Sequence, residues 1–133
     1  MDERRQTTAR TCLEAAEHGT MAFPEIVATL AAAGFESYAV DFRRATATYY
    51  LPDGDSIALP SLRVEEPVAA MFDTARVRAA IREAQQNAPG YTYAGFCRKV
   101  VAAGCAGYVV SFTGRRALYV GRTAETHVEH FPR

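Results

Sequence analysis

The sequence predicts an α+β domain built by internal duplication of an α-α-β-β-β unit, with an antiparallel sheet or sheets covered by helices. Two observations carry this prediction: a long internal repeat, and a change from helical to strand periodicity at matching points of both copies. The chain has 133 residues, enough for a single domain with its own core.

The repeat is clearest between "AAGFESYAVDF" (32–42) and "AAGCAGYVVSF" (102–112), which lie 70 residues apart. At this offset, eight residues between 23 and 49 are identical to their counterparts. Duplication is the simplest explanation. We therefore treat 1–133 as a single domain, divided into a first unit, a linker and a second unit at about 6–60, 61–72 and 73–132.

Each unit is expected to begin with two helices, which we place at residues 6–18, 24–33, 74–88 and 92–103. Asp73 and Thr92 are suitable N-caps, and Pro24 fits a first helical turn. Gly34 and Gly104 stand where a helix often ends in a left-handed residue, a conformation that glycine adopts at little cost.

Three short strands should follow in each unit, at residues 37–42, 46–51, 56–60, 107–112, 117–120 and 127–132. Two-residue alternation places Tyr38, Val40 and Phe42 on one face. The sequence leaves open whether the strands form one six-stranded sheet or two three-stranded sheets. An offset of 72 aligns 56–60 with 128–132, and the sequence leaves open whether the linker includes a short helix.

The charges argue against a nucleic-acid partner, because the 15 basic and 15 acidic residues cancel. Residues 1–75 hold 6 Arg against 12 Asp and Glu, a net of −6, and residues 76–133 hold 9 Arg and Lys against 3 Glu, a net of +6. Opposite halves suit mutual packing, head-to-tail association in a homodimer, or a cationic face for an anion.

The chain also lacks the sequence marks of a membrane or secreted protein. No apolar run approaches about 20 residues, and the charged N-terminus does not resemble a secretory leader. The three cysteines are odd in number and lack metal spacing. We therefore expect reduced thiols and a cytoplasmic location, with no membrane partner, no cofactor and no metal site.

The C-terminal stretch "RTAETHVEHFPR" holds the most chemistry. As a strand it places His127 and Glu129 on one face and His130 on the other, so a two-histidine metal site is not expected. We expect a binding or interaction module whose ligand site lies where the hairpins of the two units meet. Its residues would be Tyr49, Tyr50, Tyr119, Arg122, His127 and Glu129.

Two alternatives remain. The first is an enzyme in which His127 and Glu129 form an acid–base pair acting on a small anion held by Arg122. The second is a self-associating structural protein with exposed strand edges. Arg115 and Arg116, at the tip of a hairpin, are also suited to hold an anion together with Arg122.

The segments "FPEIVATLAAAGFESYAVDF", "TYYLPDG", "AGCAGYVVSF", "YVGR" and "HVEHFP" resemble a domain-of-unknown-function family of small bacterial proteins. Some of its members bear the label phage envelope protein. The resemblance runs over most of the chain and implies a bacterial single domain, but it implies no reaction, cofactor or catalytic residue. The envelope label does not fit a chain without a leader or membrane span.

Overall fold

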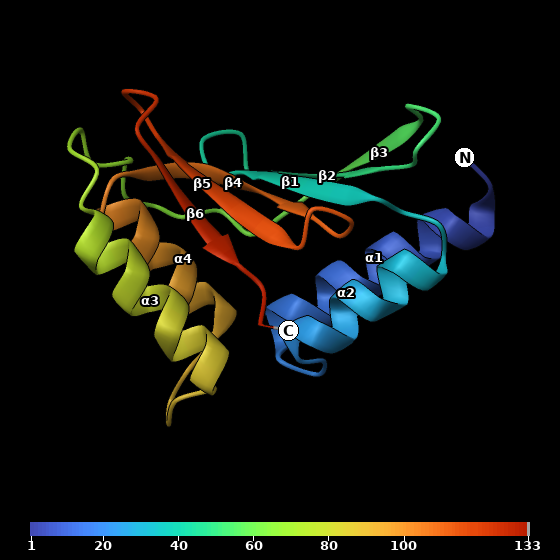
Figure 1. The fold of residues 1–133 in the computed structure, drawn as a ribbon, viewed down its shortest axis with the longest axis horizontal. Helices are drawn as coiled ribbons and strands as arrows, with labels where there is room; N and C mark the ends of the chain where they lie inside the picture. Colours follow the sequence, from blue (N-terminus) through green and yellow to red (C-terminus); the bar gives the residue numbers. More distant parts are fainter. Residues whose placement is uncertain (133) are drawn as a thin grey trace.

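The computed structural model describes residues 1–132 and shows four helices and six strands that follow the order α-α-β-β-β twice (Figure 1). The elements are α1 (Glu3–His18), α2 (Phe23–Ala32), β1 (Ser37–Asp41), β2 (Thr46–Tyr50), β3 (Ser56–Pro60), α3 (Thr74–Gln86), α4 (Tyr93–Ala102), β4 (Cys105–Ser111), β5 (Arg116–Gly121) and β6 (Thr126–His130). The α+β class is confirmed.

The six strands form one antiparallel sheet in the order β3-β2-β1-β4-β5-β6, which settles the choice between one sheet and two. The two halves of the chain meet where β1 pairs with β4, with Tyr38 opposite Val110 and Val40 opposite Tyr108. Gly107 makes this approach possible, because a Cβ there would collide with the carbonyl oxygen of Val40.

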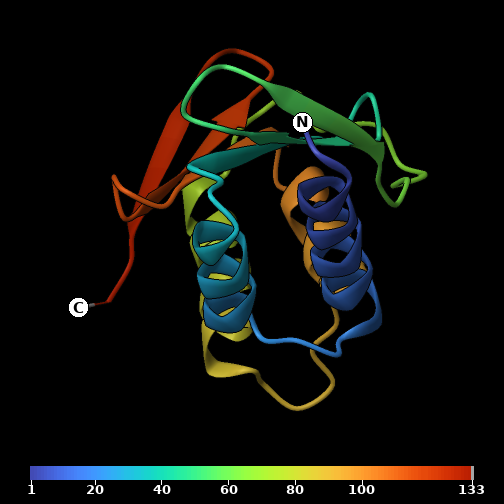
Figure 2. The same cartoon turned by 90° about the vertical axis from the view of Figure 1, so that its right-hand side faces the viewer.

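All four helices lie on one face of the sheet, with α1 beside α2 and α3 beside α4 (Figures 1 and 2). The helix α1 also contacts α4 across the two pairs. We call the covered face the inner face and the opposite one the open face. The alternation of a strand therefore decides whether a side chain enters the core or faces away from every helix.

Side-chain caps fix the helix starts. Asp2 accepts a hydrogen bond from the backbone N–H of Arg5 at 2.9 Å, so α1 starts three residues earlier than expected. Asp73 and Thr92 cap α3 and α4 as predicted. The end of α3 comes two residues earlier than expected, because Asn87 adopts a left-handed conformation with φ of 47°.

The strands keep the 70-residue offset to the end of the sheet, so the offset of 72 used for the last strand was wrong. Tyr49 pairs with Ile57 in the first half, and Tyr119 pairs with His127 in the second. Left-handed residues recur at the same offset, at Gly34 and Gly104, Ala45 and Arg115, and Gly54 and Ala124. The counterpart of β3 is therefore 126–130.

The linker 61–72 contains no helix, which answers a question that the sequence left open. Its ends and middle are tied to both halves instead: Leu62 N–H donates to Glu17 at 2.8 Å, and Arg122 donates to the carbonyl oxygen of Val68 at 3.1 Å. Val68 and Phe72 are buried in the core. These contacts hold the segment in an extended path between β3 and α3.

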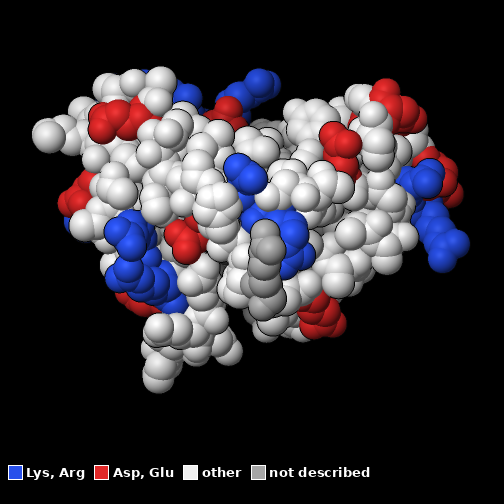
Figure 3. Space-filling model, viewed as in Figure 1, with Lys and Arg blue, Asp and Glu red and all other residues white. Residues whose placement is uncertain are grey.

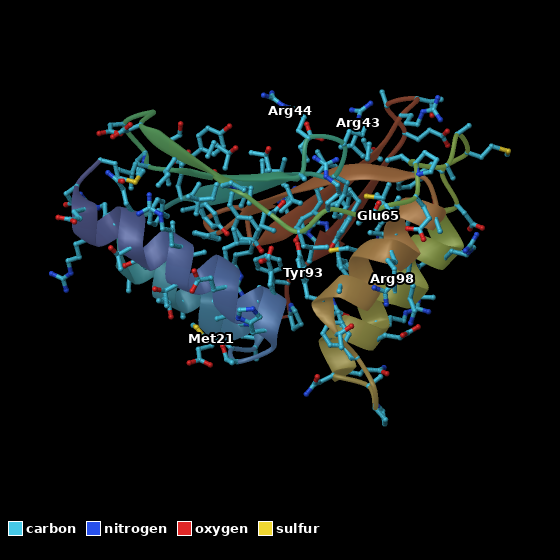
Figure 4. The ribbon with its side chains drawn as sticks, turned by 180° about the vertical axis from the view of Figure 1, so that it is seen from behind. Met21, Arg43, Arg44, Glu65, Tyr93 and Arg98 are labelled. Atoms are coloured by element: carbon cyan, nitrogen blue, oxygen red, sulfur yellow. The ribbon has the colours of Figure 1, made fainter. Side chains whose placement is uncertain are left out.

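Tyrosines fill the inner face. Tyr38 stacks on Tyr49 and Tyr108 stacks on Tyr119, each pair with ring centroids 5.3 Å apart. The hydroxyl groups of Tyr93 and Tyr108 lie 2.7 Å apart, and Figure 4 shows Tyr93 beneath the sheet. Burial raises the pKa of both groups well above the ordinary value for tyrosine. This repetition supports a packing role for the recurring tyrosines.

We predict that Gly104→Ala destabilises the fold far more than Gly34→Ala, although the two glycines are equivalent. Both have a φ near 100°, so alanine costs about 1 kcal/mol of strain at either position. At Gly104 the added Cβ would also collide with the backbone of Met71, whereas at Gly34 it would meet the flexible guanidinium of Arg5 at 3.4 Å.

Urea unfolding measures both variants against the parent protein. We expect Gly104→Ala to lose about 2 kcal/mol more than Gly34→Ala. Equal losses would show that the close approach of residues 71 and 104 does not exist in solution.

Candidate functional site

His127 and Glu129 form a hydrogen-bonded pair on the inner face of β6, with His127 Nε2 and Glu129 Oε2 2.9 Å apart. The ring of His127 lies 6.4 Å from that of Tyr119 on the neighbouring strand. Gln85 of α3 approaches the other carboxylate oxygen of Glu129 at 3.5 Å. The strand prediction for this pair is therefore confirmed, and His130 lies on the opposite face.

This polar pair stands where the first half of the chain has apolar residues. Ile57 and Leu59 occupy the equivalent positions on β3, which packs beneath α1. The side chain of Glu129 is 28% exposed, whereas Leu59 is only 7% exposed. The edge at β6 is thus less completely covered than the edge at β3, and it accommodates a partly exposed hydrogen-bonded pair of polar side chains.

The structure brings together only three of the six residues proposed as a ligand site, namely Tyr119, His127 and Glu129. Tyr49 is buried on β2, and two strands separate it from Tyr119. Tyr50 follows it in the chain and therefore lies on the open face. Arg122 lies in the β5–β6 turn, bound to the linker. The hairpins lie side by side and do not converge.

A cavity of about 400 Å³ lies at the tip of the β4–β5 hairpin, where β6 ends. Its lining residues are Thr113, Gly114, Arg115, Arg116, His130 and Phe131. Three of them carry guanidinium or imidazole groups, and none is acidic. Within residues 1–132, no carboxylate forms an ion pair with either arginine. We call this cavity the hairpin pocket.

Backbone contacts fix the arginines of the hairpin pocket. Arg115 donates from Nη2 to the carbonyl oxygen of Pro132 at 2.9 Å, and Arg116 donates from Nε to that of Gly114 at 3.0 Å. Phe131 N–H donates to the carbonyl oxygen of Arg115 at 2.9 Å. The ring of Phe131 meets that of Phe23 edge-on, with centroids 5.5 Å apart. The tip of the hairpin is therefore anchored to β6 and α2.

Arg115 adopts a left-handed conformation with φ of 52°. A residue with a Cβ loses about 1 kcal/mol in this region relative to glycine. Its equivalent in the first half, Ala45, has a φ of 50°. Both hairpins therefore require this left-handed conformation, but only the second one carries a guanidinium there. A cationic side chain is thus held at a position where glycine is the less strained choice.

A second cavity of about 370 Å³ lies between the linker and the hairpin tips at the other end of the sheet. Arg43, Arg63 and Arg122 line it together with Glu65 and Glu66, so its charges are mixed. Figure 3 likewise shows acidic and basic side chains interspersed over the viewed face, rather than one large cationic patch. An anion has less reason to select this cavity than the hairpin pocket.

The three cysteines are free and buried. Burial raises the pKa of Cys97 to about 12 and that of Cys105 to about 11, which disfavours the thiolate needed by a nucleophile. Among residues 1–132, no three His, Cys, Asp or Glu side chains converge as a metal ion requires. None of the described helices has both the length and the apolar character needed to cross a membrane.

The sequence pointed to part of the hairpin pocket, since Arg115 and Arg116 were expected to hold an anion together with Arg122. Arg122 instead lies at the other end of the sheet, bound to the linker. Strand alternation separates His130 from His127, so the sequence alone predicts no site role for His130. Its role in the pocket depends on a pairing across strands, because Arg116 lies opposite His130. Phe131 joins the pocket because its ring packs against α2, a contact that no local sequence pattern predicts.

Comparison with known proteins does not identify the chain. No protein-family model matches it, and no match was found among curated proteins. The resemblance to a bacterial family therefore stays a prediction.

Proposed function

We propose that the protein is a binding module whose hairpin pocket recognises a carboxylate or phosphate group. The observation that carries this proposal is a cavity lined by the guanidinium groups of Arg115 and Arg116 and the imidazole of His130, with no acidic side chain among its lining residues in the described part of the chain. Guanidinium groups present paired N–H donors that match the oxygens of both anions.

The surroundings support the same ligand class. Each arginine commits one nitrogen to a backbone carbonyl, so its orientation is fixed before a ligand arrives. Preorganised donors lose less conformational freedom on binding. Phe131 adds an aromatic wall, which suits a small anion that carries an apolar part.

We predict that Arg115→Gly weakens the binding of inorganic phosphate at least tenfold and raises the free energy of unfolding by about 1 kcal/mol. The substitution removes a cationic donor and also relieves the left-handed strain. Isothermal titration calorimetry with phosphate measures the first effect, and urea unfolding measures the second.

Ala45→Gly is the matched control, because it relieves the same conformation in the first hairpin and leaves the pocket intact. We expect it to stabilise the fold without changing phosphate affinity. The proposal fails if the parent protein binds neither phosphate nor acetate, or if Arg115→Gly binds phosphate as tightly as the parent does.

A second candidate function is catalysis by His127 and Glu129. The 2.9 Å contact between their side chains favours it, because a carboxylate can orient an imidazole for proton transfer. Neither of the two cavities described above is lined by this pair, so we rank the binding module first. The pair remains the best candidate for acid–base chemistry on a small anion.

We predict that His127→Ile with Glu129→Leu leaves the free energy of unfolding unchanged or raises it by up to about 1 kcal/mol. The double variant installs the residues that the first half has at these positions. Replacing both partners of a partly buried hydrogen bond with apolar residues is often neutral or stabilising, and functional residues are often kept at a cost in stability.

The reciprocal variant, Ile57→His with Leu59→Glu, is the control and should destabilise the fold, because α1 covers β3. Thermal and urea unfolding compare all three proteins. If the His127 and Glu129 double variant loses more than about 2 kcal/mol of unfolding free energy, the pair serves to stabilise the fold, and the catalytic candidate is rejected.

We further infer that the fold arose by duplication and that the protein works in a reducing compartment such as a bacterial cytoplasm. The shared 70-residue offset of identities, strand register and left-handed residues supports the duplication. The three free, buried cysteines support the reducing compartment.

A further inference from the structure

We propose that the open face of the sheet binds a second copy of the chain, related by a twofold axis that runs along the strands. This inference does not rest on anion binding in the hairpin pocket, although Arg116 and His130 belong to both surfaces. It rests on the pattern of side chains on the face that no helix covers (Figures 1 and 2).

The open face is unusually poor in charge. The register assigns it three residues from each strand, and Asp41, Arg116 and His130 are its only acidic, basic or imidazole side chains within the described chain. It carries no lysine and no glutamate, although 23% of all residues are charged. Tyr50, Val109 and Val128 are between 37% and 41% exposed on it. Low charge with exposed apolar groups is typical of an interface.

The middle row of this face is graded by size. Register places six side chains in one line across the sheet, in the order Ala58, Thr48, Ala39, Val109, Leu118 and Val128. The first half of the chain supplies the three small ones, and the second half supplies the three large ones. The side chains of this row therefore project less from the sheet on β1, β2 and β3 than on β4, β5 and β6.

A twofold axis along the strands lays β3 over the partner's β6, β2 over its β5 and β1 over its β4. Each large side chain of the middle row then faces a small one: Val128 faces Ala58, Leu118 faces Thr48, and Val109 faces Ala39. Packed layers interdigitate best when large and small residues alternate across the contact. The other in-plane twofold axis would set each of these residues against itself, and large residues would collide.

The outer rows agree with the same axis. Tyr50 faces Arg116, a pairing of aromatic ring and guanidinium that is favourable. The turn that holds Asp53 and Asp55 lies at the same end of the sheet as Arg115 and Arg116. Asp55 is paired with the amino group of Met1, so Asp53 supplies the negative charge that approaches the partner's basic turn. At the far end of the sheet, Arg43 and Arg44 rise above it (Figure 4). In the dimer they face the turn of the second copy that holds Glu125. This charge pattern favours a second copy over an unrelated partner.

The face is large enough for such a contact. Six strands about 4.8 Å apart and five residues long, with a rise of about 3.4 Å each, span about 29 Å by 17 Å. Two such faces bury about 1,000 Å² in total, the lower bound for a specific interface. We therefore expect a weak, reversible dimer rather than an obligate one.

Sedimentation equilibrium of the full chain tests the dimer, and a size-swap cycle tests the axis. Thr48→Leu sets leucine against leucine, and Leu118→Thr leaves two gaps, so each should raise the dissociation constant at least tenfold. The double variant pairs leucine with threonine again and should return the constant to within about threefold of the parent value. Positions 48 and 118 lie about 14 Å apart within one sheet, so their coupling has to cross the interface.

Two further variants separate interface from fold. Val109→Lys should abolish the dimer and keep the circular dichroism spectrum, whereas Ala79→Lys, on the exposed surface of α3, should leave the dimer intact. Three results would overturn the proposal. They are a strict monomer at about 1 mM, a dimer that persists in Val109→Lys, or a double variant whose dissociation constant is as high as that of Thr48→Leu. None of these positions lines the hairpin pocket, so the failure of the dimer and the failure of anion binding remain distinguishable.

Discussion

The pairing of β1 with β4 is the constraint on which the rest of the structure depends. It joins two three-stranded units, each too small to bury its helices alone, into one six-stranded sheet. Gly107 permits the contact, and the aromatic rings of Tyr38 and Tyr108 meet across it at 6.3 Å. Both helix pairs lie on the same face of the sheet, so the core is continuous beneath the β1–β4 pairing. No helix of the described chain covers the opposite face.

The residues proposed for function lie at positions where the two halves differ. At the covered edge, α1 seals β3 with Ile57 and Leu59, and the corresponding positions on β6 hold a His–Glu pair. At the hairpin tips, the first half has Ala45 and the second has Arg115 in the same strained conformation. Because the two halves share one order of elements, one half can maintain packing where the other carries polar groups, and the polar groups described here lie in the second half.

Much of the fold was predictable because its signals are local. Caps such as Asp73, left-handed glycines such as Gly104 and strand alternation placed every element within a few residues. The site was harder, because it depends on strand order and register. The sequence placed Tyr49 and Tyr119 together since both recur, but β1 and β4 lie between them. The pocket unites residues 113–116 with His130 only through the β5–β6 register, which a two-residue error had shifted.

Native-state hydrogen exchange at the β1–β4 pairing tests most directly whether this pairing holds the domain together. Phe42 N–H donates to Ala106 and Phe112 N–H donates to Glu36, both at 3.0 Å, so these two amides report on the β1–β4 contact from its two ends. If this pairing holds the domain together, both should exchange only through global unfolding, more slowly than the Phe131 amide at the β6 edge. Exchange of Phe42 and Phe112 as fast as that of Phe131 would contradict the account, because the halves would then separate without unfolding.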